Sequence, residues 1–548
     1  MKKENIRWIW EKLKGYRVHL FVLSILVILS AVCSLLIAYV LKEFVDVATH
    51  ESQSTIGDTV IFAVLVVIAS GAIGIICSVL SARIQTETEK KIKSLIIKKY
   101  FRSDLSKIEN MHSGEVLTRL TEDVNDVSTL FPNLATKMLG NASVAIFAII
   151  SLFLLNVKVA LMIVITIPLL ISIISLFNFP IGKADENKKA MEDSNRVLMQ
   201  EYINKVKTIK IFGAQDRFIS IFIDNYKRLA NKKIVFSAWE GLATFCNKLI
   251  GNAMILITLG YGSYLVIQNE TSLGSLIAMV QLLNYIINPF SQVSEQISAI
   301  AKASVSVDRI VGITNYEEKS EVVRNSDGTD DFKSLIMKNV SFAYSDKEIL
   351  NNINLEFKKD KVYCIQGDNG IGKSTLLNIL AGLYKPNSGD VYFLGINNEK
   401  ISSDDNPCIS LVPADETLFN GTIRDNITLF NRHTNEEKLA EIVKISNLQS
   451  VLDSTKKGYD TLISENGKSV SSGQAQQITI CRSLYHNAKI LLLDEPTSNL
   501  DKDSVAIFRN MLTNLKKDRI VIIVSHDNNI LDCCDYIYKI EEGAVVCA

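Results

Sequence analysis

The feature that most limits the folds open to this chain is an apolar run at residues 18–40, VHLFVLSILVILSAVCSLLIAYV, which contains no Asp, Glu, Lys or Arg. A helix of about 20 apolar residues crosses the roughly 30 Å hydrocarbon core of a bilayer. The run is longer than the apolar region of about 7–15 residues in a secretory signal peptide, and more apolar runs follow it. It therefore predicts a membrane-spanning helix rather than a cleaved signal.

Further apolar runs of comparable length predict about six spans in total. They lie at about residues 60–80, 141–155, 160–177, 242–266 and 273–290. Lys and Arg are frequent before the first run and in the two long intervals between runs, and they are nearly absent from the short links. By the positive-inside rule, the N-terminus, the long intervals and the C-terminal half are cytoplasmic. The chain is thus predicted to be a multi-pass protein of the cell membrane.

The two long cytoplasmic intervals, residues 83–137 and 183–233, predict helices that continue beyond the membrane. Their stretches 87–111 and 192–233 contain helix formers, apolar residues at helical spacing and no proline. An interval of this length in a compact protein normally has its own structure or a function. We expect these helices to reach the C-terminal half, although a charged face that only holds the spans apart is compatible with the same residues.

Composition indicates two unlike parts in the chain. A hydrophobic content of 48% over 548 residues is high for a soluble enzyme and low for a wholly embedded protein. Lys and Arg total 59, and Asp and Glu total 59, so the net charge gives no case for a nucleic-acid partner. The 9 cysteines include no CxxC pair, which argues against a zinc site or a disulfide framework.

The expected domain boundaries follow from a fall in hydropathy after Arg309. We expect a membrane domain at residues 1–315, a polar linker at 316–331 and a soluble domain at 332–548. In the soluble part, strand-like pieces alternate with helical pieces, which predicts an α/β sheet with buried strands. The predicted fold class is a multidomain membrane protein, in which an all-α bundle of about six transmembrane helices precedes an α/β domain.

One glycine-rich turn in the soluble part has the form of a phosphate-binding loop (P-loop). The sequence KVYCIQGDNGIGKSTLLNIL places GDNGIGKST between a strand and a helix, the setting that distinguishes such loops from chance matches. Glycines let backbone amides converge on phosphate oxygens, the lysine reaches the terminal phosphates and the serine ligates Mg²⁺. The candidate nucleotide-binding residues here are Gly367, Asp368, Asn369, Gly370, Ile371, Gly372, Lys373, Ser374 and Thr375.

Paired carboxylates end a later hydrophobic strand, KILLLDE. Asp494 is a candidate Mg²⁺ ligand beside Ser374, and Glu495 is the candidate base that polarises an attacking water. His526 closes another strand, IVIIVSH, and is a second candidate catalytic residue through contact with the terminal phosphate. The carboxyl ends of parallel strands meet at one edge of a sheet, so these residues and the phosphate loop are expected to lie together.

The segment SVSSGQAQQITICRSLYHNAKILLLDEPTSNLD resembles the signature region of ATP-binding-cassette (ABC) proteins. With the phosphate loop and the VSH run, the resemblance covers the soluble domain. The order of spans and then a cassette is similar to ABC exporters, so the resemblance extends over the whole chain. It implies that Ser471, Gly473 and Gln474 bind nucleotide and that Tyr344 stacks on adenine. It also implies ATP and Mg²⁺ as cofactors.

The same resemblance implies a pair of chains. In ABC proteins the phosphate loop of one cassette and the signature of the other enclose each ATP, so this half-transporter is expected to form a homodimer, with a heterodimer as the alternative. Asp501 would lie at the interface between cassettes, and Glu465 would communicate across it. Segments 105–113 and 201–208 would be the coupling helices that touch the cassettes.

Two positions depart from the family pattern. Ala414 stands where a glutamine is usual, and a methyl group cannot ligate a metal, so Asp415 or Glu416 is a candidate substitute. Ser472 stands where the signature usually has a glycine close to the γ-phosphate. Its hydroxyl would either donate to phosphate or crowd it. Because the other catalytic residues are present, the cassette is expected to hydrolyse ATP.

The resemblance implies an ATP-driven transporter that exports a small amphipathic molecule, a lipid or a peptide by alternating access. The alternative is a membrane ATPase that gates or regulates a partner protein without moving a substrate. Soluble ABC-like ATPases that act on DNA are excluded by the apolar runs. The nucleotide-binding domain is expected on the cytoplasmic side of the membrane.

Overall fold

The chain forms two compact units in the computed structural model, which describes residues 3–103, 105–108, 111, 113–314, 332–344, 347–402, 409–414, 418–463, 470–498, 500, 502–541 and 543–547. The helical unit comprises Met1–Tyr100 and Ser113–Tyr316. The sheet-containing unit comprises Phe101–His112 and Glu317–Ala548. The short segment 101–112 thus groups with the sheets although both of its neighbours in sequence belong to the helical unit.

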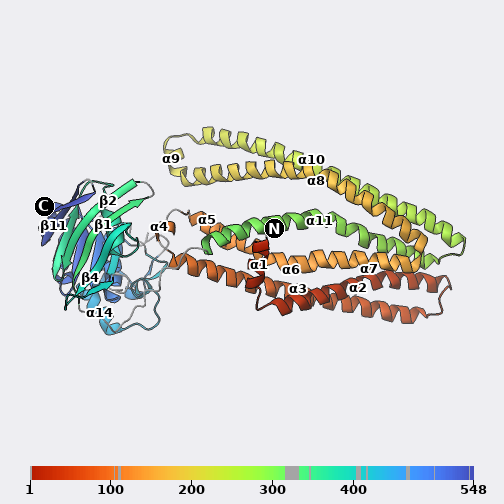
Figure 1. The fold of residues 1–548 in the computed structure, drawn as a ribbon, viewed down its shortest axis with the longest axis horizontal. Coiled ribbons are helices and arrows are strands. Elements are labelled where there is room, and N and C mark those ends of the chain that lie inside the picture. The colour runs from red at the N-terminus through yellow and green to blue at the C-terminus, as the bar shows by residue number, and fades with distance from the viewer. Residues whose placement is uncertain are drawn as a thin grey trace. The chain divides into compact units, whose positions relative to one another are not determined.

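Long helices joined by short connections make up the helical unit (Figure 1). Its elements in chain order are α1 (Lys3–Lys12), α2 (Arg17–Ala48), α3 (Ile56–Arg102), α5 (Ser113–Thr118), η1 (Arg119–Asp123), α6 (Val124–Asn133), η2 (Leu134–Leu139), α7 (Gly140–Leu155), α8 (Val157–Asn204), α9 (Val206–Ile211), α10 (Gln215–Ile267) and α11 (Leu273–Thr314). The elements η1 and η2 are π-helical turns, and they bracket α6. The two turns therefore interrupt the helical stretch that leads into the third predicted span, and that span, residues 141–155, is the regular helix α7.

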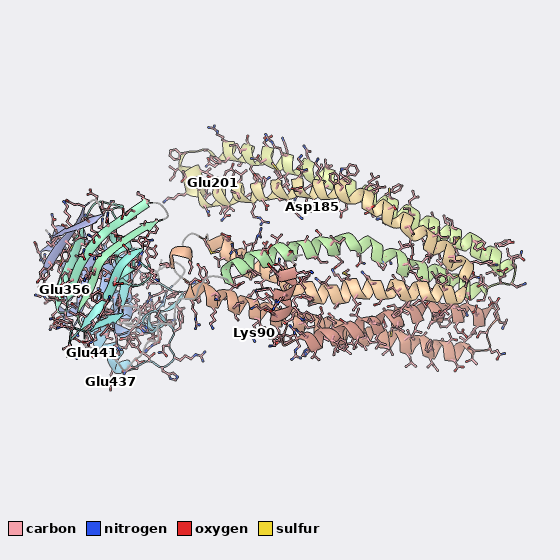
Figure 2. All side chains as sticks on the ribbon, viewed as in Figure 1. Lys90, Asp185, Glu201, Glu356, Glu437 and Glu441 are labelled. Atoms are coloured by element: carbon pink, nitrogen blue, oxygen red, sulfur yellow. The ribbon has the colours of Figure 1, made fainter. Side chains whose placement is uncertain are left out.

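Within the described residues, 4 helical stretches are long and apolar enough to cross a membrane: α2, α3, residues 114–155 and α10. Shorter apolar parts, Val157–Pro168 of α8 and Leu273–Pro289 of α11, lie where the remaining spans are expected. The predicted extensions are confirmed, because α3, α8 and α10 run far beyond their apolar parts. Figure 2 shows the charged side chains of Asp185 and Glu201 on the part of α8 that leads to α9.

One end of α11 is fixed by a buried carboxylate. Asp46 is 4% exposed, pairs with Lys42 at 2.9 Å and accepts a hydrogen bond from the Gly274 backbone N–H at 3.0 Å. A carboxylate at a helix N-terminus satisfies a free donor and favours the helix dipole. A Cβ at Gly274 would collide with the Asp46 carboxylate and the Lys42 carbonyl oxygen. Only glycine therefore lets α11 begin this close to α2.

Two sheets form the frame of the second unit. Its elements are α4 (Leu105–Ile108), β1 (Phe332–Tyr344), β2 (Lys347–Lys358), β3 (Lys361–Gln366), α12 (Lys373–Leu380), β4 (Ser388–Gly395), β5 (Lys400–Ser402), β6 (Ile409–Val412), β7 (Gly421–Thr422), α13 (Ile423–Thr428), α14 (Glu436–Ile445), α15 (Gln449–Ser454), η4 (Gly458–Asp460), β8 (Leu462–Ile463), α16 (Ser472–Tyr485), β9 (Ile490–Asp494), α17 (Lys502–Leu515), β10 (Ile520–Val524), α18 (Asn528–Leu531), β11 (Tyr536–Glu541) and β12 (Ala544–Cys547). The antiparallel sheet has the order β2-β1-β4-β5, and the larger sheet has the order β12-β11-β3-β10-β9-β6. All pairings in the larger sheet are parallel except that of β12.

The larger sheet is buried on both faces, as its continuous apolar strands predict. Alternate residues of β9 enter different cores: Leu491 and Leu493 pack in one cluster with α16, and Ile490 and Leu492 pack in another with α12. Side chains of a strand point alternately to the two faces of its sheet. Helices α12 and α16 therefore cover opposite faces.

Candidate functional site

The strand register brings the predicted catalytic segments to one edge of the larger sheet. Val524, the last residue of β10, is in register with Ile365 of β3 on one side and with Asp494 of β9 on the other. Neighbouring strands lie about 4.8 Å apart, so the ends of the three strands are adjacent. The phosphate loop leaves β3, Glu495 follows β9 and His526 follows β10 at this edge, as the sequence predicted.

The conformation of the phosphate loop requires its glycines. Gly367, Gly370 and Gly372 have φ angles of 151°, 80° and 112°, values that side chains rarely adopt. A Cβ on Gly367 would lie 2.8 Å from the carbonyl oxygen of Ile540, and one on Gly372 would lie 2.6 Å from Ile349 Cγ2. Gly372 is also the N-cap of α12, so the loop ends on a helix N-terminus that favours anions.

The Lys373 side chain lies inside the loop. Lys373 is 6% exposed, and its Nζ donates to the backbone carbonyl oxygens of Gly367 at 2.7 Å and Asp368 at 3.0 Å. A phosphate oxygen bearing negative charge makes a stronger hydrogen bond to an ammonium group than these neutral carbonyl acceptors do. The ammonium is thus placed to bind the terminal phosphates.

A carboxylate and a hydroxyl suited to a hard cation meet beside the loop. The Ser374 side chain hydrogen-bonds Asp494, and this bond lowers the pKa of Asp494, as does the positive charge of Lys373. Burial is the largest effect, and together with the nearby charge of Glu495 it raises the pKa of Asp494 above its usual value. Oxygen ligands of these two kinds fit Mg²⁺, which keeps most of its waters and takes one or two protein ligands.

Glu495 has a strained backbone. Its φ angle is 45°, in the left-handed region that few residues other than glycine adopt, and its N–H donates to the carbonyl oxygen of Val524 at 2.9 Å. The side chain is half-buried. Strain of this kind costs about 1–3 kcal/mol and gathers at functional sites. The hydrogen bond to β10 holds Glu495 next to the strand that carries His526, whose side chain is exposed.

The proposed adenine platform is connected to the phosphate loop. Tyr344 is 41% exposed, and its hydroxyl lies 3.4 Å from Thr375 Oγ1. The rings of Phe342 and Tyr384 pack edge-on against it, with centroid distances of 5.0 and 5.8 Å. The tyrosine therefore presents an ordered aromatic surface beside the helix that starts at Lys373.

The signature residues form a capping box at the N-terminus of α16. Ser471 Oγ accepts from the Gln474 N–H at 3.3 Å, and the Gln474 side chain accepts from the Ser471 N–H at 3.0 Å. Ser472 is a regular residue of α16, so the backbone of this chain does not require a glycine there. Because α16 and α12 cover opposite faces of the sheet, the signature and the phosphate loop belong to different faces of one cassette.

Two contacts around the signature helix were not predicted from the sequence. Gln476 Nε2 donates to the carbonyl oxygen of Pro496, directly after Glu495, and so links α16 to the carboxylate segment. Arg482 donates to the backbone and side-chain oxygens of Asn426 at 2.7 and 2.9 Å. Gln476, Arg482 and Pro496 lie in the stretch that resembles the signature region, but the resemblance assigned no role to them, so these contacts were not indicated.

Several predicted positions lie outside the described residues: Asp415, Glu416, Glu465, Asp501 and the linker 316–331. Ala414 lies within the described residues and follows β6. Because β6 pairs with β9 in parallel, Ala414 lies near the sheet edge that carries Asp494. Of the expected coupling segments, α4 groups with the cassette and its Leu105 packs against the core that contains α12. The other expected segment, 201–208, runs from the end of α8 into α9, and α9 has no buried residue.

Two family models match the chain in the order seen in the structure. The model described as the ABC transporter transmembrane region matches residues 20–290, and the model described as ABC transporter matches residues 350–498. The chain belongs to the ABC transporter family. The family and fold class expected from the sequence are thereby confirmed.

Relatives of this ABC transporter match over nearly its whole length. A putative export ATP-binding/permease protein of Rickettsia typhi is 26% identical over 98% of this chain and 94% of its own. A multidrug resistance ABC transporter ATP-binding and permease protein of Lactococcus lactis is 26% identical over 89% of this chain and 83% of its own. A bacterial Atm1-family ABC exporter solved with ATP bound has the same fold, with a TM-score of 0.78, 19% identity and coverage of 97% of this chain and 94% of its own.

Proposed function

We propose that this ABC transporter is an ATP-driven exporter that works as a pair of identical chains, with each ATP held between the phosphate loop of one chain and the signature of the other. The observation that carries the pairing is the placement of α12 and α16 on opposite faces of one sheet. A single cassette therefore does not turn both motifs toward the same ATP. A twofold pair of chains supplies two complete sites.

Each motif residue has a role that its geometry supports. Lys373 and the loop amides bind the β- and γ-phosphates, and Tyr344 stacks on the adenine. Glu495 accepts the proton of the attacking water, and His526 donates to the γ-phosphate. Ser374 and Asp494 would hold Mg²⁺, which when bound offsets the negative charge of the phosphates.

Binding of ATP closes the paired cassettes, and hydrolysis with release of phosphate lets them separate. The cytoplasmic extensions of the helical unit carry this movement to the spans, so a cargo site opens alternately to each side of the membrane. The names of the relatives, which describe an export permease and a multidrug resistance transporter, support export as the direction. A small amphipathic molecule, a lipid or a peptide is the proposed cargo class.

We also propose the domain boundaries of 1–315, 316–331 and 332–548. They are supported by the end of α11 at Thr314 and the start of β1 at Phe332. The exception is segment 101–112, which groups with the cassette and is the proposed first coupling segment. The proposed second coupling segment is α9 with its flanking residues, which carries the exposed apolar side chains of Ile211 and Phe212.

A mixed dimer tests the shared site directly. Two inactive variants, Lys373→Ala and Gly473→Asp, carry different affinity tags and are purified together through both tags. With sites shared between chains, the mixed dimer keeps one intact site, hydrolyses ATP there and traps the ADP product with vanadate at about half the wild-type amount. Trapping no greater than in either single variant would contradict the shared site.

A further inference from the structure

We propose that Asp123 is a positioning residue that couples the cassettes to the last span. Asp123 lies in η1, shortly after segment 101–112, which groups with the cassette, and it contacts α11. The inference rests on the proposed function, since it concerns how ATP binding reaches the membrane. Asp123 would act through α11 and would touch neither nucleotide nor cargo.

The first observation is a buried acidic contact between η1, which precedes the third span, and the part of α11 that extends beyond the last predicted span. Asp123 is 2% exposed, and its Oδ1 accepts from Ser306 Oγ at 2.9 Å and from Arg309 Nη1 at 3.5 Å. Ser306 is itself 2% exposed, and its single hydroxyl proton is shared with Asp126 Oδ2, at 3.3 Å from Ser306 Oγ. Lys302, one helical turn away on α11, pairs with Asp126 Oδ1 at 2.9 Å.

The contact places a carboxylate where an apolar side chain could also fill the space between the helices. Asp123 Oδ2 is buried and has no hydrogen-bond partner among the described residues. Burying a carboxylate is costly, and apolar residues of similar size often pack at least as stably as a buried ion pair. The two acidic side chains, Asp123 and Asp126, instead fix the register of α11 against η1 and α6. Their donors on α11 are Lys302, Ser306 and Arg309.

The second observation is the local structure around Asp123. Asp123 is the last residue of η1, and a second π-turn, η2, follows α6. A π-turn interrupts the regular hydrogen-bond ladder, and such turns are common sites of bending and of function. A cavity of about 80 Å³ lies between α6 and α11, lined among others by Thr129, Asn133 and Gln296. The segment α6 thus has a hinge at each end and free space on the side of α11.

The third observation is the path of the chain. Segment 101–112 groups with the cassette, and α5 and η1 follow directly, so Asp123 stands at the first hinge beyond a cassette-associated segment. On the other side of the contact, α11 is held at its far end by Asp46. A displacement of segment 101–112 would therefore pass through η1 and the Asp123–Ser306 contact to α11, which spans the membrane.

Hydrogen exchange of the full chain in nanodiscs tests the coupling. The parent carries Glu495→Gln so that bound ATP persists, and exchange is measured with and without ATP and Mg²⁺. We expect ATP to change exchange of peptides in both 113–123 and 292–314 by at least about fivefold, the lower range of coupling between sites. In Asp123→Asn and in Ser306→Ala, the change in 113–123 should persist and that in 292–314 should fall below about twofold.

Matched variants separate coupling from a structural role. Ser306→Thr keeps the hydroxyl and should restore the response that Ser306→Ala loses. Asp224→Asn, which breaks an exposed pair with Arg228 on α10, should respond as the parent does. The inference is overturned if ATP changes hydrogen exchange of 292–314 equally in the parent and in Ser306→Ala. It is also overturned if ATP changes exchange of neither segment in the parent. Failure of the proposed function is a separate result: the chain with Glu495 intact would not hydrolyse ATP.

Discussion

Among single residues, Asp494 shows how strongly burial controls the chemistry of the site. Its pKa is raised, chiefly by burial, so the folded protein favours the protonated form more than the unfolded chain does. The stability that this group contributes is therefore present at acid pH and is lost as the pH rises through the raised pKa. At neutral pH the ionised carboxylate works against folding until a cation binds it.

We predict that Asp494→Asn raises the melting temperature of the nucleotide-free protein at pH 7 and abolishes its stabilisation by Mg²⁺ with ATP. The increase should shrink as the pH falls, because the raised pKa lets the folded wild-type carboxyl take up its proton before the carboxyl of the unfolded chain does. Thermal unfolding of the full chain in detergent at several pH values measures both effects. A lower melting temperature at pH 7 in the variant would show that the charged form is stabilised by contacts other than a cation.

A second residue-level prediction concerns Ala414. It follows the strand next to β9, so a glutamine there would bring hydrogen-bonding groups to the edge that carries Asp494. Ala414→Gln should raise the ATPase rate by about two- to tenfold, the equivalent of one net hydrogen bond of about 0.5–1.5 kcal/mol. Steady-state phosphate release measures it. An unchanged rate would indicate that Asp415 or Glu416 already serves this role.

Motif residues were predictable because each motif is contiguous in sequence. The phosphate loop, the DE pair and the signature carry their own strand or helix context, and the parallel register then assembles them. The contact of Gln476 with Pro496 joins residues 20 positions apart, and that of Arg482 with Asn426 joins residues 56 apart. Contacts of this kind depend on how α16 packs, which no local pattern specifies.

At the scale of elements, the spans could be predicted from apolar length, and the two π-turns that precede the third span could not. The turns η1 (RLTED) and η2 (LATKML) contain ordinary helix-forming residues, and neither contains glycine or proline. A π-turn arises when the packing of a helix on its neighbours favours one extra residue in a turn. Asp123 ends η1 and is buried against Ser306 of α11. This contact is visible only in the packed structure and not in the sequence of either helix.

The start of α11 gives a prediction about an element. Gly274→Ala would place a methyl group against the Asp46 carboxylate and the Lys42 carbonyl oxygen, and overpacking of this kind costs roughly 1–3 kcal/mol. We expect a lower melting temperature in detergent. Gly251→Ala is the matched control, because its Cβ would meet Ile287 at an ordinary 3.5 Å. Equal stability of the two variants would mean that α11 does not depend on this close approach.

At the scale of the whole molecule, the sequence indicated a membrane bundle joined to a cassette, and the two units of the structure bear this out. The resemblance implied that residues near 105–113 touch a cassette, and segment 101–112 groups with the cassette unit. The proposed dimer is inferred from a single chain, because α12 and α16 cover opposite faces of its larger sheet.

The most direct measurement is steady-state ATP hydrolysis by the purified chain alone in nanodiscs, beside Glu495→Gln and Glu441→Gln. Glu441 lies exposed on α14 (Figure 2), so its variant controls for the loss of a carboxylate. The account predicts wild-type activity that Glu441→Gln retains and that Glu495→Gln lowers by about 10²–10⁴-fold, the usual contribution of a general base. Wild-type activity no higher than that of Glu495→Gln would contradict an exporter driven by a pair of these chains.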